Sequence, residues 1–161
     1  MKNRDLIYGT LLGDAWIYKD KRGYSLFAFC QVNEEYARWK AKLLGYEYKE
    51  YKRNRFDKRT GKIYSSLSIH TKMPKEDKEE LLSIFYQPKK IVTQEILDEL
   101  TDQAICLWYL DDGSMYYNGN NCHLQLSIDG FTLIERELII SYFKDKFGLN
   151  FKHTSKAIRI T

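Results

Sequence analysis

Two aspartates, Asp14 and Asp112, stand at matching places in the sequence and could hold metal ions together. Each ends an apolar run and is followed by a small residue, Ala15 or Gly113. Apolar runs of this kind predict helices, and two such helices packed side by side would bring both carboxylates together. Carboxylates held close raise each other's pKa, so a shared site favours divalent cations that prefer oxygen ligands, such as Mg²⁺. Such ions can activate water and stabilise a phosphoryl transition state, whereas an aspartate taken alone would indicate only a turn.

The helices that must position these aspartates differ in one respect. The first, predicted over 5–14 with Asp5 as its N-cap, carries Gly9 and Gly13 on one face. Two glycines at this spacing remove side chains from a stripe, so another helix can approach unusually closely. The second apolar helix is predicted over 101–112, with Thr101 as its N-cap.

The same order of elements follows each of these helices. The further predicted strands and helices lie at 15–18, 24–32, 33–45, 46–56, 63–71, 75–86, 94–100, 115–118, 122–129, 131–148, 151–155 and 157–161. The order helix, strand, strand, helix, strand, strand therefore occurs twice, with 98 residues between the two aspartates. We predict an α+β chain made of two halves, 1–98 and 99–161.

Basic side chains are concentrated in one segment, residues 49–62, although the formal net charge of the chain is only +4. The segment has two acidic residues, and its basic residues are Lys49, Lys52, Arg53, Arg55, Lys58, Arg59 and Lys62. A segment with this charge can attract phosphates, while a solvated hairpin is the alternative interpretation.

Two predicted strands alternate apolar and polar side chains, so each should have one polar face. The polar positions are Tyr64, Ser66, Ser68 and His70 in the first half and His123, Gln125, Ser127 and Asp129 in the second.

Several classes of protein are excluded. Three cysteines without CxxC spacing indicate neither a disulfide framework nor a zinc site, and the three histidines lack zinc-ligand spacing. No apolar run approaches the ~18 residues of a membrane span, and the N-terminus lacks the regions of a signal peptide. We therefore expect an intracellular protein of the cytoplasm, the nucleoid or an organelle, with no membrane partner.

The two apolar helices resemble the motifs of a known family. IYGTLLGDA (7–15) and ICLWYLDDG (105–113) are similar to the two copies of the motif of LAGLIDADG homing endonucleases of the two-motif, single-chain type. The resemblance implies two pseudo-symmetric half-domains of α-β-β-α-β-β-α type, whose antiparallel sheets form a DNA-binding saddle. Leu107 and Asp111 replace the two motif glycines in the second copy, so an asymmetric helix interface is expected, and Asp111 is assigned no role.

The resemblance also implies an activity. It predicts a site-specific, Mg²⁺-dependent endonuclease of double-stranded DNA that serves intron or intein mobility, with Mn²⁺ as a substitute ion. Asp14 and Asp112 would be both catalytic and metal-binding residues. Lys89 or Lys90 would supply a basic group near the metal ions, with Lys90 favoured. The expected DNA contacts are the seven basic residues of 49–62 together with Tyr64, Ser66, Ser68, His70, His123, Gln125 and Ser127.

The second half is expected to lack its last helix, because only 49 residues follow Asp112. This leaves three alternatives open. The chain could nick DNA or bind it without cleavage, it could be an intron RNA maturase, or it could be one part of a split endonuclease that a second protein chain completes.

Overall fold

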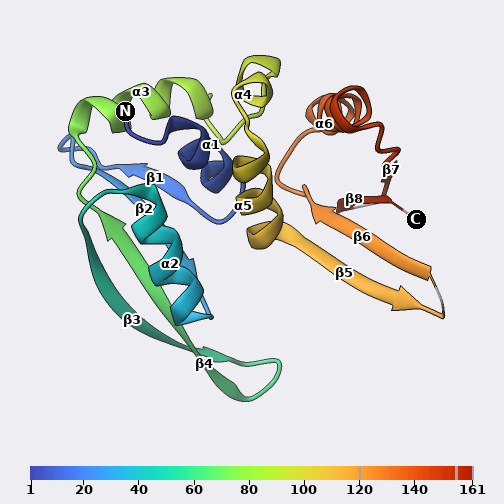
Figure 1. The fold of residues 1–161 in the computed structure, drawn as a ribbon. Coiled ribbons are helices and arrows are strands. Elements are labelled where there is room, and N and C mark those ends of the chain that lie inside the picture. Colours follow the sequence, from blue (N-terminus) through green and yellow to red (C-terminus); the bar gives the residue numbers. More distant parts are fainter. Residues whose placement is uncertain (120, 155, 161) are drawn as a thin grey trace.

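The computed structural model describes residues 1–119, 121–154 and 156–160 (Figure 1). The first half forms α1 (Arg4–Leu12), β1 (Trp16–Lys19), β2 (Ser25–Gln31), α2 (Glu34–Leu44), β3 (Tyr48–Asp57), β4 (Lys62–Thr71), α3 (Lys75–Phe85) and α4 (Gln94–Asp98). The second half forms α5 (Asp102–Asp112), β5 (Gly113–Asn118), β6 (Asn121–Ser127), α6 (Leu133–Phe147), β7 (Lys152–His153) and β8 (Ala157–Ile160). The chain is therefore α+β, as predicted.

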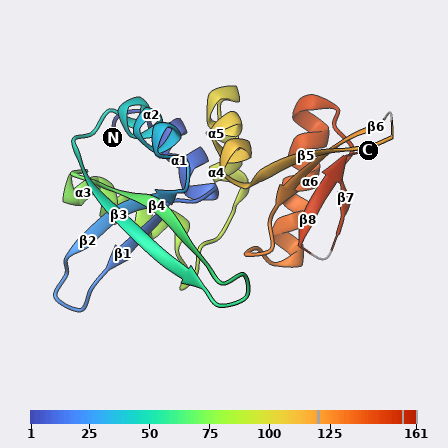
Figure 2. The ribbon, with the colours of Figure 1, turned by 90° about the horizontal axis from the view of Figure 1, so that it is seen from below.

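The strands form two antiparallel sheets with the same strand order. One sheet has the order β1-β2-β4-β3 and the other β5-β6-β8-β7. Counted within each half, the two orders are identical, which confirms the structural repeat. Figures 1 and 2 show the two sheets on either side of the paired helices α1 and α5.

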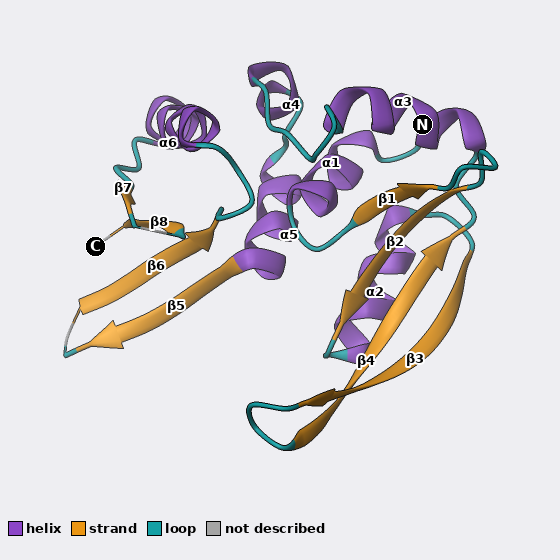
Figure 3. Ribbon diagram, turned by 180° about the vertical axis from the view of Figure 1, so that it is seen from behind, coloured by secondary structure: helices purple, strands orange, loops and turns teal. Residues whose placement is uncertain are grey.

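The close pairing of α1 with α5 depends on glycine. A Cβ atom at Gly9 would overlap the backbone of Ala104, and one at Gly13 would lie 2.6 Å from the Cβ of Asp111. The two helices therefore touch through backbone at one point and through a single side chain at the other. Figure 3 shows them side by side at the centre of the molecule, where they join the halves.

Alternation along the strands gives the first sheet a helix-covered face and a free face. Phe27 and Phe29 of β2 and Leu67 and Ile69 of β4 are fully buried on the side of α2 and α3. Ile63 was predicted on the same apolar face, yet it is 68% exposed. The reason is that the β3–β4 hairpin extends beyond the helices, as Figure 1 shows.

The helices begin and end within two residues of their predicted bounds, but the predicted N-cap of the first helix is wrong. Asn33 and Thr101 are N-caps, as predicted. Asp5 is not, because the carbonyl of Asn3 accepts the first helical hydrogen bond from Ile7. Asp5 lies in the first turn, where its carboxylate accepts a hydrogen bond of 2.6 Å from the hydroxyl of Thr101.

The final hairpin is shorter than predicted. Its strands are only the two residues of β7 and the four residues of β8, and the predicted positions 155 and 161 lie outside the described residues. The predicted division after residue 98 falls at the end of α4, which packs beside α6. The described helices include none that is both long and apolar enough to cross a membrane.

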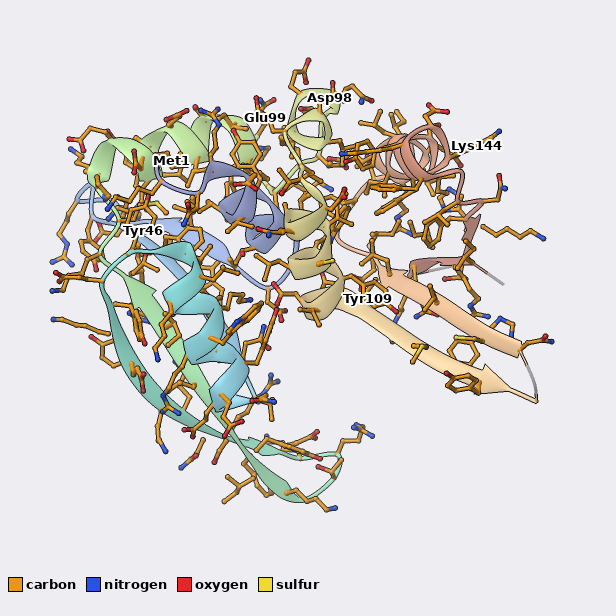
Figure 4. All side chains as sticks on the ribbon, in the orientation of Figure 1. Met1, Tyr46, Asp98, Glu99, Tyr109 and Lys144 are labelled. Carbon is orange, nitrogen blue, oxygen red and sulfur yellow. The ribbon has the colours of Figure 1, made fainter. Side chains whose placement is uncertain are left out.

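An apolar groove of about 400 Å³ opens between α5, β6 and α6. Its lining residues are Ile105, Cys106, Trp108, Tyr109, Leu110, Leu124, Leu126, Phe143, Leu149 and Phe151. Tyr109 marks the place in Figure 4, near the end of α5, where its hydroxyl donates a hydrogen bond to the carbonyl of Ser114. In the first half, α3 covers the matching surface and packs Phe85 against Tyr8. Among the described residues no helix follows β8.

Candidate functional site

Asp14 and Asp112 lie where the central helices end. α1 stops at Leu12, so Asp14 stands in the turn that follows, whereas Asp112 is the last residue of α5. Burial, together with the negative charges of Asp14 and Asp111, raises the pKa of Asp112 to about 7. Burial and the charge of Asp111 likewise raise the pKa of Asp14. The structure thus gathers these carboxylates at one place, where their charges oppose one another.

Lys90 lies at the same place, whereas Lys89 does not. The Nζ atom of Lys90 donates hydrogen bonds to the carbonyl oxygens of Gly13 (3.0 Å) and Ala15 (3.1 Å). Burial lowers the pKa of Lys90, against the charges of Asp112, Asp14 and Asp111, which raise it. Lys89 is exposed, and its charge acts on Glu135. Of the two lysines named from the sequence, only Lys90 is positioned to act on the aspartates.

Asp111, which sequence reasoning left without a role, is the most highly connected carboxylate of the site. Its side chain is 0% exposed and accepts hydrogen bonds from Lys40 Nζ at 2.7 and 2.9 Å. The hydroxyl of Tyr36 donates to it at 2.8 Å, and the backbone N–H of Asp14 at 3.2 Å. Gln31 bridges two carboxylates, because its amide nitrogen lies 3.0 Å from Asp111 Oδ1 and 2.8 Å from Asp14 Oδ2.

The sequence does carry a signal for this network. Lys40 lies on the apolar stripe of α2, among the buried residues Ala37, Ala41 and Leu44. A lysine on such a stripe needs a buried anionic partner, because an unpaired buried charge is costly. The positive charge of Lys40 also lies 4.4 Å from the centre of the Phe29 ring. Burial lowers the pKa of Lys40, and Asp111 raises it.

The donor set suits a hard divalent cation. Asp129 adds its charge to that of Asp112, and both line a hollow of about 200 Å³ together with Lys90 and Ser127. Four carboxylates therefore face two lysines, Lys40 and Lys90, which leaves excess negative charge at the site. Within the described residues, no three His, Cys, Asp or Glu side chains form a ready ligand group. Backbone carbonyls, water and substrate oxygens would complete the coordination, as Mg²⁺ commonly requires.

The predicted DNA-contact residues of the first half divide between the two faces of the hairpin. Lys49, Arg53 and Arg55 of β3 lie opposite His70, Ser66 and Tyr64 of β4, and these pairs share the free face of the sheet. Lys62 lies opposite Asp57 on the same face, while Lys58 and Arg59 occupy the turn. This face therefore combines exposed positive charge with polar side chains.

Two of these predicted contacts do not fit the structure. Lys52 lies opposite Leu67, on the helix-covered face, and forms an ion pair with Glu34 at 3.1 Å. Ser68 is on the free face but is fully buried, so its hydroxyl does not reach the surface. Its neighbour His70 packs against Tyr51, with ring centres 4.5 Å apart.

The second sheet has a corresponding polar face. His123, Gln125 and Ser127 share it with Tyr116, whose ring stacks on His123 at 5.1 Å. Sequence reasoning missed Arg159, which donates a hydrogen bond to Gln125 at 3.0 Å. Only the register of β8 against β6 identifies that residue as part of the face.

Some polar atoms on these faces have no partner within the protein. In the described part of the chain, the buried side-chain atoms without a hydrogen bond are Ser68 Oγ, His70 Nε2, Trp108 Nε1, His123 Nδ1 and Arg159 Nε. Four of the five belong to the free faces of the two sheets. Because buried polar atoms are normally paired, these faces are where a ligand or water would supply the missing bonds.

Comparisons with known proteins agree with this geometry. The profile of the LAGLIDADG DNA endonuclease family matches residues 4–159. An uncharacterized protein of Methanocaldococcus jannaschii, MJ1098, is 27% identical over 95% of the chain, and protein RecA of Mycobacterium leprae is 24% identical over 90%. The chain spans 59% and 21% of the lengths of these two curated relatives.

Two solved structures share the fold. The homing endonuclease I-WcaI bound to its DNA recognition sequence superposes with a TM-score of 0.83 at 24% identity, covering 97% of this chain and 74% of that one. The N-terminal LAGLIDADG domain of DUF199/WhiA superposes with a TM-score of 0.54 at 12% identity, covering 100% of this chain and 76% of that domain.

Proposed function

Since this chain belongs to the LAGLIDADG DNA endonuclease family, we propose that it hydrolyses double-stranded DNA at specific sites with the help of divalent cations. The observation that carries the proposal is the meeting of Asp14 and Asp112 at the ends of two packed helices, between two sheets with free polar faces. Intron or intein mobility is the biological role proposed with this activity.

The residues of the site divide the chemistry between them. Asp14 and Asp112 would hold Mg²⁺, which Mn²⁺ could replace, and the cation would supply activation of water and neutralisation of the leaving oxygen. Lys90 holds the turn after α1 through the carbonyls of Gly13 and Ala15. The charges of Asp14 and Asp112 act on Lys90, so its positive charge would stabilise negative charge that develops on a phosphate bound there.

The free faces of the sheets would bind the DNA. Lys49, Arg53 and Arg55 are placed to contact phosphates, which gives affinity but no sequence information. His70, His123, Gln125 and Arg159, which lie on these faces, would contact base edges. The likeness in fold to I-WcaI, which was solved bound to its DNA recognition sequence, supports DNA as the ligand.

Cleavage of a plasmid library with randomised inserts tests the proposal. The wild-type chain is expected to cut defined sites with Mg²⁺ and none with a chelator, and Asp14→Asn and Asp112→Asn should each abolish cutting. Asp145→Asn, an exposed aspartate on α6, is the matched control and should cut normally. Cutting that persists in both site variants would overturn the assignment of the aspartates.

Binding without cleavage is the second candidate function, and the likeness to the WhiA domain in fold is compatible with it. The observation that favours it is the open apolar groove beside α5, which leaves one side of the catalytic helix without packing. Retention of the library on the protein without any cut product would select this candidate. An intron RNA retained in place of DNA would instead select the maturase.

The same groove is the observation behind a second proposed partner, an apolar helix of another protein chain that would pack against α5, β6 and α6. In the first half, α3 serves as the example of such a helix. It packs against β1 and β2, and its Phe85 contacts Tyr8 of α1. A labelled synthetic peptide of residues 73–91 is therefore expected to bind the intact chain, and Leu110→Glu should weaken that binding. Equal binding to both proteins would contradict the proposal.

A further inference from the structure

Asp111 belongs to α5 of the second half, yet every side chain that it contacts by hydrogen bond belongs to the first half. Lys40 and Tyr36 come from α2, and Gln31 comes from the end of β2. The Asp111 side chain can reach the first half because Gly13 has no side chain and leaves room for it in the interface between α1 and α5. A carboxylate of one half therefore completes the hydrogen-bond network of the other.

This network holds Asp14 at two points. The backbone N–H of Asp14 donates to Asp111 Oδ2, and the side chain of Gln31 ties Asp14 Oδ2 to Asp111 Oδ1. Lys40 fixes Asp111 in turn through both of its oxygens, with both side chains 0% exposed. One oxygen of Asp14 is thus occupied by the Gln31 amide, which orients the carboxylate.

The second half has no such support for Asp112. At the repeat of 98 residues, Asp111 corresponds to Gly13. The strand pairings match Phe27 with Leu124, so Gln31 corresponds to the buried apolar residue Ile128. Counted from the helix N-caps Asn33 and Thr132, Lys40 corresponds to the apolar residue Ile139. The described residues on the Asp112 side therefore have no amide in the place of Gln31 and no lysine in the place of Lys40, while the charge of Asp129 acts on Asp112.

We infer that Asp111, fixed by Lys40, is a positioning residue that orients Asp14 through Gln31, so that the two DNA strands are served by unequal half-sites. The inference rests on the proposed endonuclease function. Duplex DNA and the pseudo-symmetric halves share an approximate two-fold axis, so each aspartate faces one strand. Loss of the network should slow cleavage of the DNA strand that faces Asp14, and not cleavage of the other DNA strand. The expected loss in rate is about 10- to 100-fold, the range usual for residues that orient a metal ligand.

The variant Asp111→Ala/Lys40→Met removes the network without leaving an unpaired buried charge. The substrate is a supercoiled plasmid that carries one site cleaved by the wild type. On it the double variant should accumulate nicked circular plasmid, with the nick always in the same DNA strand. Gln31→Met, which leaves the pair Lys40–Asp111 intact, should give the same nick. Asp111→Asn/Lys40→Met keeps one acceptor oxygen and should recover part of the lost rate. Equal slowing of both strands would overturn the inference.

A second readout needs neither DNA nor metal. The Asp14 amide hydrogen should exchange with solvent at least about 10-fold faster in Asp111→Ala/Lys40→Met than in the wild type, while exchange in α3 remains slow. The exposed double variant Asp145→Asn/Lys144→Met is the control and should change neither exchange nor strand rates. Unchanged exchange at Asp14 would contradict the positioning role. A wild type that cuts no DNA would contradict only the endonuclease function.

Discussion

The two halves share one topology but differ in how their central helix is covered. In the first half Leu12 is 2% exposed and Ile17 is 6% exposed, and α3 packs against β1, the strand that carries Ile17. The corresponding residues of the second half, Leu110 and Met115, are 56% and 57% exposed. The repeat therefore preserves strand order and the place of the aspartates, while the packing that stabilises each half has diverged.

The halves also differ in charge and in the surroundings of their aspartates. The basic segment 49–62 belongs to the first half. Asp14 is held by the Gln31 amide, whereas Asp112 lies beside another carboxylate, Asp129. We conclude that the first half contributes most of the packing and the positive charge, and that the second half contributes the more strongly perturbed carboxylate.

The largest expected difference is in packing. Phe85→Ala would remove the fully buried ring that packs against Tyr8, and should lower the free energy of unfolding by about 4 kcal/mol. Leu110→Ala, in the exposed groove of the second half, should lower it by about 0.5 kcal/mol or less. Urea unfolding measures both values. Equal losses would show that the two halves are covered to the same degree.

Separating the halves should have the next largest effect. Gly9→Ala places a Cβ into the backbone of Ala104, so α1 and α5 must move apart, at a cost of about 2 to 3 kcal/mol. Gly130→Ala is the matched control, since nothing lies within 4 Å of the added atom. Its effect should stay within about 0.5 kcal/mol. A tolerated alanine at residue 9 would refute the close helix contact.

Neutralising the aspartates should stabilise the metal-free protein unequally. Burial raises the pKa of Asp112 in the folded protein from its ordinary 3.8 to about 7. The neutral carboxyl stabilises the folded protein at low pH, and this stability is lost as the pH rises through 7 and the buried carboxyl ionises. At pH 8 Asp112→Asn should therefore raise the Tm by about 4 °C, with little change near pH 4. Asp14→Asn should raise it less, because Gln31 and Lys40 counteract the rise in the pKa of Asp14. Differential scanning calorimetry in the presence of a chelator measures the Tm of both variants. A larger rise in Tm for Asp14→Asn than for Asp112→Asn would contradict the prediction.

The smallest expected effect concerns phosphate contacts. Arg53→Ala should lower the salt dependence of DNA binding by about one unit in the slope of log Kd against log salt concentration. Lys52→Ala, one residue away on the opposite face of β3, should leave the slope unchanged. Fluorescence anisotropy at several salt concentrations measures both. A matching drop for Lys52→Ala would mean that DNA does not approach the free face.

Much of the fold could be predicted because its signals are local. Apolar runs, the N-caps Asn33 and Thr101, and alternation along the strands each depend on neighbouring residues. The network of Asp111 could not be placed in this way, because it needs three elements from two halves in contact. The place of Lys52 could be predicted in part. Strand alternation puts Lys52 on the face opposite to Lys49 and Arg53, but the register is needed to tell which face the helices cover. The burial of Ser68 depends on neighbours from other strands and had no local signal.

The Asp111 side chain also limits how this protein can be recombined. A chimaera that joined residues 99–161 to the first half of another protein would insert a carboxylate into that half. Unless the host offered a small residue at the place of Gly13 and a buried cation at the place of Lys40, the charge would stand unpaired in the joint. Compatibility between exchanged halves is therefore decided by these three positions together, and an engineer must transfer them as one set.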